Sequence, residues 1–125
     1  MQTECLFCSL PPERVIAQND LAYAIRDGFP VTGMHTLVVP KRHVEDYFGL
    51  SSEELLACDA LLRSLKSDIT RTDPMVVAFN IGMNAGRAAG QTIFHCHIHL
   101  IPRREGDVEN PRGGVRHVIP GKGFY

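Results

Sequence analysis

Short runs of apolar residues alternate with polar residues along much of the chain. Such alternation predicts β-strands, because successive side chains of a strand face opposite sides of a sheet. The predicted strands cover residues 15–18, 21–25, 35–40, 75–80 and 95–101. The first two flank Asn19-Asp20, a turn-forming pair, and therefore predict a hairpin.

A helical periodicity begins at Ser51. Ser51 and Glu54 have the spacing of a capping box, in which each side chain accepts a hydrogen bond from the backbone N–H of the other residue. This start predicts one amphipathic helix from Ser51 to about Thr70. Its leucines are expected in the core or on a dimer face, and its apolar positions are Leu55, Leu56, Leu62, Leu65 and Ile69.

Composition narrows the class of protein. A chain of 125 residues fits one domain with a core of its own. Its 13 Lys and Arg balance 14 Asp and Glu, so overall charge does not favour a nucleic acid polymer or a membrane surface. Residues 1–5 contain no apolar run, which predicts neither a signal peptide nor a transmembrane helix and favours a cytoplasmic protein. The basic, turn-rich residues 104–125 are expected to form a partly ordered tail.

Three histidines alternate with apolar residues near the end of the predicted sheet. The alternation places His95, His97 and His99 on one face, while the intervening residues face a core. Residues two apart on a strand lie roughly 6.5–7 Å apart, so the three rings are able to serve one extended site in different roles. Such a row is able to bind a metal, supply a general acid or base, or attack a phosphorus or carbonyl centre.

The four cysteines favour a metal pair over disulfides. Cys5 and Cys8 form a Cys-x-x-Cys pair, Cys58 falls in the predicted helix and Cys96 points toward the core. Two thiolates at this spacing are able to chelate one zinc ion, but a zinc site needs about four ligands. A reduced pair of surface thiols is the alternative interpretation.

Two loops carry groups suited to a nucleotide. Residues 84–92 are rich in small residues, and glycines there let backbone N–H groups converge on a phosphate, although a plain connector has the same composition. Asp27 leaves a predicted strand beside Gly28, where a carboxylate is able to hold a sugar hydroxyl or simply to form a solvated turn. His35 and His43 lie at opposite ends of one predicted strand and are expected to serve different places.

Several of these features occur in one order. Asp27 follows an early strand, His35 opens Thr-Leu-Val-Val-Pro, Gly90-Gln91-Thr92 closes the loop, and the row of histidines comes next. With this set, residues 5–103 resemble the histidine triad (HIT) family of nucleotide-binding hydrolases and transferases. The resemblance implies an α+β fold with an antiparallel sheet of about five strands, packed by one long and one or more short helices. It also implies a homodimer and a domain over residues 1–103.

The resemblance further implies a reaction. His97 would be the nucleophile, attacking an α-phosphorus to form a nucleotidyl-histidine that water hydrolyses, while His99 and His35 contact phosphate oxygens and assist proton transfer. The substrate is a small nucleotide, held by residues that bind its ribose, orient it, contact its phosphate or wall its base, namely Asp27, Asn84, Gln91, Thr92, Ile25 and Phe29.

A structural zinc site also follows from the resemblance. Related proteins use a Cys-x-x-Cys pair, a histidine after the strand that ends in proline, and the first histidine of the row as ligands. Here these residues are Cys5, Cys8, His43 and His95, a set able to close a tetrahedral site. Such a zinc ion would hold the amino-terminal segment to the histidine row.

Three functions are therefore distinguished. The first is a nucleotide hydrolase, either a phosphoramidase or a dinucleoside-polyphosphate hydrolase. The second is a zinc-dependent hydrolase that uses the histidine row, which is disfavoured because no carboxylate follows the row in a ligand position. The third is a module that senses nucleotides without catalysis. The sequence selects neither nucleobase nor leaving group, and it gives His117 no role.

Overall fold

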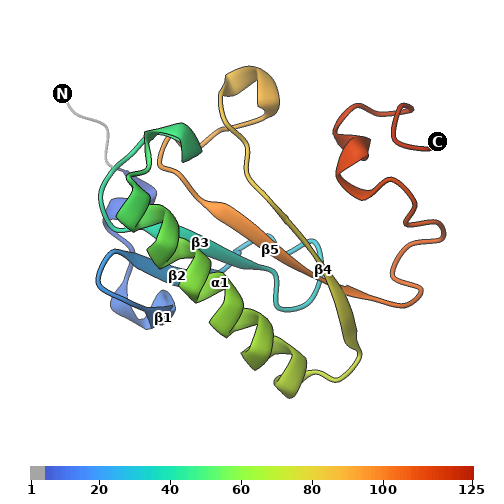
Figure 1. Ribbon diagram of the computed structural model, residues 1–125, viewed down its shortest axis with the longest axis horizontal. Helices are drawn as coiled ribbons and strands as arrows, with labels where there is room; N and C mark the ends of the chain where they lie inside the picture. The colour runs from blue at the N-terminus through green and yellow to red at the C-terminus, as the bar shows by residue number, and fades with distance from the viewer. Residues whose placement is uncertain (1–4) are drawn as a thin grey trace.

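The computed structural model describes residues 5–125, which form one antiparallel sheet with a long helix across one face (Figure 1). The strand order is β1-β2-β3-β5-β4. The strands are β1 (Val15–Gln18), β2 (Ala22–Arg26), β3 (Thr36–Pro40), β4 (Val76–Gly82) and β5 (Ile98–Arg104). This arrangement confirms the predicted α+β fold.

The first two strands form the predicted hairpin. Val15 pairs with Ile25 in antiparallel register. The carboxamide oxygen of Asn19 accepts hydrogen bonds from the backbone N–H groups of Leu21 and Ala22, so its side chain closes the turn. The amide nitrogen of the same side chain donates to the carbonyl oxygen of Ala57, which ties the hairpin to the helix.

Helix α1 (Ser52–Thr72) begins at the predicted capping box. Glu54 N–H donates to the Ser51 hydroxyl, and Ser51 N–H donates to the Glu54 carboxylate. Arg42 donates two further hydrogen bonds to this buried carboxylate and, as the largest cause, lowers the pKa of Glu54 to about 2. The carboxylate therefore stays ionised where the helix meets the sheet.

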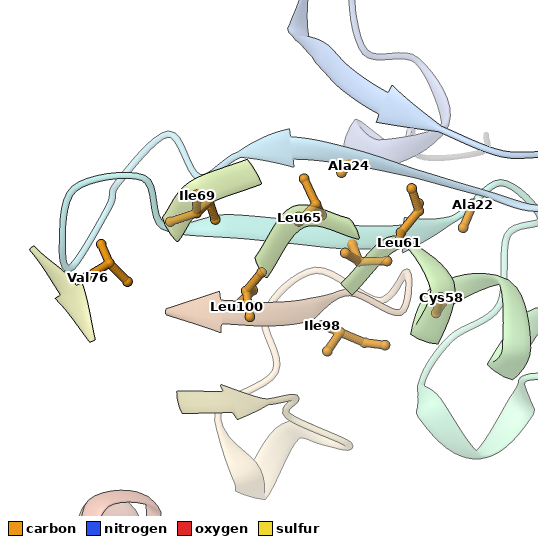
Figure 2. Close-up of a cluster of buried hydrophobic side chains, with 10 residues drawn as sticks. Ala22, Ala24, Cys58, Leu61, Leu65, Ile69, Val76, Ile98 and Leu100 are labelled. Atoms are coloured by element: carbon orange, nitrogen blue, oxygen red, sulfur yellow. The ribbon is translucent and has the colours of Figure 1, made fainter. Parts of the chain in front are cut away.

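The main core lies between α1 and the sheet, and Figure 2 shows its side chains interleaved between the two layers. The buried face of the helix comprises Cys58, Leu61, Leu65 and Ile69, which pack on apolar residues of β2, β3 and β5. Leu56 is 71% exposed and takes no part in this core. A second apolar cluster on the other side of β2 and β3 contains Phe7 and Leu37.

The histidine row differs from the predicted strand at both ends. Strand β5 begins only at Ile98. The Cys96 N–H donates outside the sheet, to the Val44 carbonyl oxygen, and the His95 side chain bonds to the Pro40 carbonyl oxygen at the end of β3. The strand also continues through Pro102. The Pro102 carbonyl oxygen accepts a hydrogen bond from the Thr32 hydroxyl on the β3 side, where pairing with β3 ends at Leu100. A missing N–H on that side removes no bond of the sheet.

Short 3-10 helices accompany the sheet, as the resemblance implies. They lie before β1, between β3 and α1, between β4 and β5, and after β5, and they cover Leu6–Cys8, Pro12–Arg14, Tyr47–Gly49, Arg87–Ala89 and Gly114–Val118. The last of these, η5 (Gly114–Val118), lies beside β4 in the carboxy-terminal segment (Figure 1). Within residues 5–125, no helix has the length and apolar character needed to cross a membrane. Residues 1–4, on which part of the leader prediction and the start of the predicted domain depend, lie outside the described residues.

Candidate functional site

Four of the six histidines belong to two clusters of side chains that carry possible ligand atoms, and a fifth lies beside them. The first, here called the thiol–imidazole cluster, comprises Cys5, Cys8, His43 and His95, whose ligand atoms all lie within 4.8 Å of one another. The second, here called the proton cluster, comprises Asp27, His35 and His99. His97 lies next to the second cluster, with its ring centroid 5.4 Å from that of His99.

A backbone turn and one carbonyl oxygen orient the side chains of the thiol–imidazole cluster. The turn Leu6–Cys8 closes on a hydrogen bond from Cys8 N–H to the Cys5 carbonyl oxygen, which brings both sulfurs together. His95 Nε2 lies 2.8 Å from the Pro40 carbonyl oxygen, an atom that only accepts, so Nε2 carries the proton and Nδ1 presents a lone pair. Nδ1 faces the sulfurs of Cys5 at 3.3 Å and Cys8 at 3.5 Å.

These distances fit a zinc ion. In a tetrahedral site with Zn–S of about 2.3 Å and Zn–N of about 2.0 Å, sulfur and nitrogen ligands lie about 3.5 Å apart. The His43 Nδ1 to Cys8 Sγ distance is 3.4 Å, which agrees with the distances from His95. Burial lowers the pKa of His95, and a neutral imidazole is the form that binds metal. The four predicted ligands therefore meet in space with donor atoms suited to zinc.

His97 is held by the backbone of His95. Its Nδ1 lies 2.8 Å from the His95 carbonyl oxygen, so Nδ1 carries the proton and Nε2 keeps its lone pair. The ring packs against Phe7, with centroids 5.0 Å apart. An oriented imidazole with a free nitrogen is able to act as a nucleophile or as a base.

In the proton cluster, the first histidine accepts a hydrogen bond from the backbone, whereas His95 and His97 donate one to it. Val31 N–H donates to His35 Nδ1 at 3.1 Å, so the proton of neutral His35 is on Nε2. That nitrogen lies 2.9 Å from His99 Nδ1, which must accept, and the proton of neutral His99 is therefore on Nε2. Asp27 Oδ2 lies 3.4 Å from His35 Nε2. The result is a chain of hydrogen bonds that runs from a backbone amide to a donor on His99.

Burial is the largest influence on this cluster. Desolvation lowers the pKa of His35, and the Asp27 carboxylate opposes this effect. Desolvation also lowers the pKa of His99, with His97 and His35 adding to the effect and Asp27 again opposing it. Both rings are therefore neutral near pH 7, in agreement with the hydrogen-bond chain.

A cavity of about 310 Å³ lies over His97 and His99, and it is here called the nucleotide cavity after the ligand that the sequence resemblance predicts. The loop before β5 forms one side, with Gly86 and Gly90 at φ angles of 100° and 95° that favour glycine. The sequence-predicted residues that line it are Ile25, Asp27, Phe29, Asn84, Gln91, Thr92, His97 and His99. His35 is buried and does not line this cavity.

Two of the predicted binding residues have structural partners. Both N–H groups of the Gln91 side chain are used, by the carbonyl oxygens of Glu45 and Ile93, and its oxygen accepts from Gly86 N–H. Gln91 therefore shapes the loop. Asp27 Oδ1 accepts from Phe29 N–H at 2.8 Å, which fixes the carboxylate at the edge of the nucleotide cavity.

Other lining residues were absent from the sequence prediction. Phe7, Leu10, Arg14, Leu37 and Ile93 also line the nucleotide cavity. Leu37 lies in a continuous apolar run of the third predicted strand, which indicates burial but does not show which face of the sheet the side chain takes. Arg14 reaches the cavity because its guanidinium donates to the Arg26 carbonyl oxygen across the first hairpin, a contact with no local sequence signal. Val31 acts through its backbone N–H, which side-chain patterns do not reveal.

The sequence profile of the HIT domain matches residues 10–106, which include the whole sheet, the helix and the proton cluster. The chain belongs to the HIT family. HIT membership makes it a nucleotide-binding hydrolase or transferase in general terms. An adenylylsulfatase from Arabidopsis thaliana is 32% identical over 119 residues, which are 86% of this chain, and the match covers 56% of that protein.

Solved structures of HIT proteins share the fold. A hypothetical histidine triad nucleotide-binding protein from Sulfolobus tokodaii matches with a TM-score of 0.75 and 33% identity, over 82% of this chain and 70% of that one. A zinc-bound histidine triad family protein from Mycobacterium smegmatis matches with a TM-score of 0.76 and 33% identity, over 85% of this chain and 79% of that one. The likeness extends across most of the HIT domain of this chain.

Proposed function

We propose that this HIT protein hydrolyses a nucleotide at its α-phosphorus through a nucleotidyl-histidine intermediate on His97. The observation that carries the proposal is the hydrogen bond from His97 Nδ1 to the His95 carbonyl oxygen, which leaves Nε2 as the free nitrogen beside a cavity. The substrate is a nucleoside phosphoramidate or a dinucleoside polyphosphate. The name of the adenylylsulfatase relative supports a nucleotidyl substrate of this kind.

The reaction has two steps. His97 Nε2 forms a bond to the α-phosphorus while the bond from phosphorus to the leaving group breaks, and the Nε2–H of neutral His99 donates a hydrogen bond to the leaving atom, which takes its proton from solvent water. Water then attacks the same phosphorus, the bond to His97 breaks, and the proton of the attacking water passes to solvent, so that His97 returns to its neutral form. The amide of Val31 acts through His35 in both steps, because it keeps the proton of His99 on Nε2.

The lining of the nucleotide cavity supports an orientation for the substrate. The apolar side chains of Ile25 and Phe29 form the base region, and Asp27 lies where it would accept hydrogen bonds from ribose hydroxyls. Asn84 and Thr92 lie with His97 and His99 and would contact phosphate oxygens. Gln91 holds the loop that carries them.

We further propose that Cys5, Cys8, His43 and His95 hold a structural zinc ion. The sulfur to nitrogen distances and the lone pair on His95 Nδ1 support this, as does the zinc-bound relative. Zinc at this cluster would cross-link the amino-terminal turn to the residue whose carbonyl oxygen orients His97. The homodimer stays a prediction that sedimentation velocity tests.

A catalytic zinc ion in the proton cluster is disfavoured by geometry. Its bond to His35 Nε2 would require the ring proton to move to Nδ1, where Val31 N–H already donates.

One experiment distinguishes the proposed hydrolase from a module that binds nucleotides without catalysis. Adenosine 5′-phosphoramidate is mixed with the protein, the reaction is stopped without acid, and the mass of the intact protein is measured by mass spectrometry.

We expect an AMP adduct on the wild type and none on His97→Gly. Retained binding of AMP by the variant, measured by calorimetry, shows that the nucleotide cavity is intact. An adduct of equal yield on the variant would remove His97 from the mechanism. Nucleotide binding without any adduct or release of product over hours would favour the sensing module.

A further inference from the structure

The four thiols of the chain differ in their access to solvent. Cys8 is exposed and Cys5 is partly buried, whereas Cys58 and Cys96 are buried in the core. The sulfurs of Cys5 and Cys8 lie within 4.8 Å of each other. A reagent in solution is therefore able to reach this pair before it reaches the two core thiols.

The turn between Cys5 and Cys8 also permits a bond between the two sulfurs. The Cys8 N–H donates to the Cys5 carbonyl oxygen at 3.1 Å. A turn closed between residues three apart holds their Cα atoms within about 7 Å of each other. The Cα atoms of a disulfide lie about 4.4–6.8 Å apart. Small movements within the turn are therefore sufficient to bring the two sulfurs into bonding distance.

A disulfide and the proposed zinc site exclude each other. In a tetrahedral zinc site the two sulfurs are thiolates that lie about 3.8 Å apart. A disulfide brings them to about 2 Å and removes their negative charge. His43 and His95 would then be the two ligands that remain of the four in the thiol–imidazole cluster. Oxidation of the thiol pair would therefore release the metal.

Phe7 connects the turn to the nucleotide cavity. Its ring centroid lies 5.0 Å from that of His97 and 5.9 Å from that of His95. The side chain is buried and lines the nucleotide cavity, and its carbonyl oxygen accepts a hydrogen bond from the Tyr23 hydroxyl. A change in the turn would therefore move one wall of the cavity and one neighbour of the His97 ring.

We propose that Cys5 and Cys8 are a site of oxidative modification by hydrogen peroxide, and that the disulfide they form releases zinc and weakens nucleotide binding. The release of zinc rests on the proposed zinc site, and any effect on turnover rests on the proposed hydrolysis at His97. The formation of the disulfide rests on neither.

The oxidation has two steps. The Cys8 thiolate attacks the peroxide, the O–O bond breaks, and Cys8 becomes a sulfenic acid while the hydroxide that leaves takes a proton from solvent. The Cys5 thiolate then attacks the Cys8 sulfur, the S–O bond breaks, and a second hydroxide leaves and is protonated. Two electrons pass from the two sulfurs to the peroxide, and the products are one disulfide and two molecules of water.

The first test follows the thiols and the metal. Protein loaded with zinc is treated with hydrogen peroxide while a chromogenic chelator records the release of zinc. Thiols are then counted in denaturant, and the intact mass is measured. We expect zinc to be released, the count to fall from four thiols per chain to two, and the mass to fall by about 2 Da. Dithiothreitol should restore all four thiols.

Two variants and a peptide map locate the bond. Cys58→Ala removes a buried thiol outside the turn, so it should release zinc at the wild-type rate and serves as the matched control. Cys8→Ser leaves Cys5 without a partner and should form no disulfide. Peptide mapping of the oxidised wild type should join Cys5 to Cys8, and this result does not depend on whether Cys8→Ser folds.

The second test joins the disulfide to the nucleotide cavity. The affinity for AMP, measured by calorimetry, should be about tenfold lower in the oxidised protein than in the reduced protein, because Phe7 no longer holds its place in the cavity wall. The kcat/KM for adenosine 5′-phosphoramidate should fall at least as far. Dithiothreitol with added zinc should restore both quantities.

Four results would overturn the proposal. Four thiols after treatment with peroxide would show that the pair is not oxidised. A disulfide mapped to Cys58 or Cys96 would place the oxidation in the core. Zinc retained by protein that has formed the disulfide would contradict its release. Equal affinity for AMP in the two forms would separate the turn from the cavity. Absence of turnover by the reduced wild type would instead overturn the proposed function, while the thiol, zinc and AMP measurements would still decide this proposal.

Discussion

The two histidine clusters show how one backbone partner decides what a histidine is able to do. In the thiol–imidazole cluster, His95 donates to a carbonyl oxygen and turns a lone pair toward two sulfurs. In the proton cluster, His35 accepts from a backbone amide and turns an N–H toward His99. The first arrangement suits the metal ligand that we propose, and the second suits the proposed role of the proton cluster in turnover.

The clusters are separate in chemistry but joined through one residue. The ring of His95 belongs to the thiol–imidazole cluster, while its carbonyl oxygen orients His97 beside the proton cluster. Phe7, within the Cys-x-x-Cys turn, packs against the rings of both histidines. The comparison therefore predicts that changes to the first cluster act on stability first, and that changes to the second act on turnover.

The largest effect is expected at His97. His97→Gly should lower kcat/KM by at least about 10⁴-fold, because it removes the atom that forms the bond to phosphorus. Steady-state kinetics with adenosine 5′-phosphoramidate measures the loss. The melting temperature of the variant should stay close to that of the wild type, which shows that the fold is intact. A loss of less than about tenfold would mean that another group attacks the substrate.

Removal of one zinc ligand should affect stability. Cys8→Ala is expected to lower the free energy of unfolding by about 3 kcal/mol and the melting temperature by roughly 10 °C. Zinc content by atomic emission should fall in parallel. Glu13→Ala changes an exposed residue of the same amino-terminal segment outside the cluster and serves as the control. An unchanged melting temperature in Cys8→Ala would contradict the proposal of a structural zinc ion.

The proton cluster is tested through a backbone atom. Val31→Pro removes the N–H that donates to His35 Nδ1, and kcat should fall about 10²-fold because the proton of His99 is no longer confined to Nε2. Val31→Ala keeps this N–H and should lose far less. Similar kcat values for the two variants would show that the amide of Val31 does not set the relay.

The smallest effect is a dependence of stability on pH. Burial lowers the pKa of His35 in the folded chain, so below about pH 6.5 the unfolded chain binds more protons than the folded one. Stability should therefore fall as pH decreases from 7.5 to 5.5. Urea unfolding should show a weaker dependence in His35→Gln than in the wild type. The same slope in both would show that His35 titrates normally.

Periodicity and turn chemistry were sufficient to predict most of the fold. The Ser51 capping box and the Asn19 turn depend on neighbours in sequence, and both appear as expected. The strand predicted for the histidine row was wrong in part, because the alternation of His95 with Cys96 looks like a strand whereas the Cys96 N–H bonds to Val44, outside the sheet. Local pattern cannot reveal such distant partners.

The same limit applies to the candidate site. The ordered motifs and the resemblance identified eight of the 16 residues that line the nucleotide cavity. They also named the four thiol and imidazole side chains that the fold brings together. The tautomer of each histidine depends on atoms such as the Pro40 carbonyl oxygen and the Val31 N–H, which only the folded backbone places. The packing of His117 against Gly123 and Phe124 is likewise visible only in the folded chain.

The most direct test of this account is a ¹⁵N NMR measurement of the histidine tautomers in the wild-type protein at pH 7. Protons are expected on Nδ1 of His97 and on Nε2 of His35, His95 and His99. Single histidine substitutions assign each signal. A proton on Nε2 of His97, or on Nδ1 of His35, would contradict the claim that backbone partners divide these histidines between metal binding and catalysis.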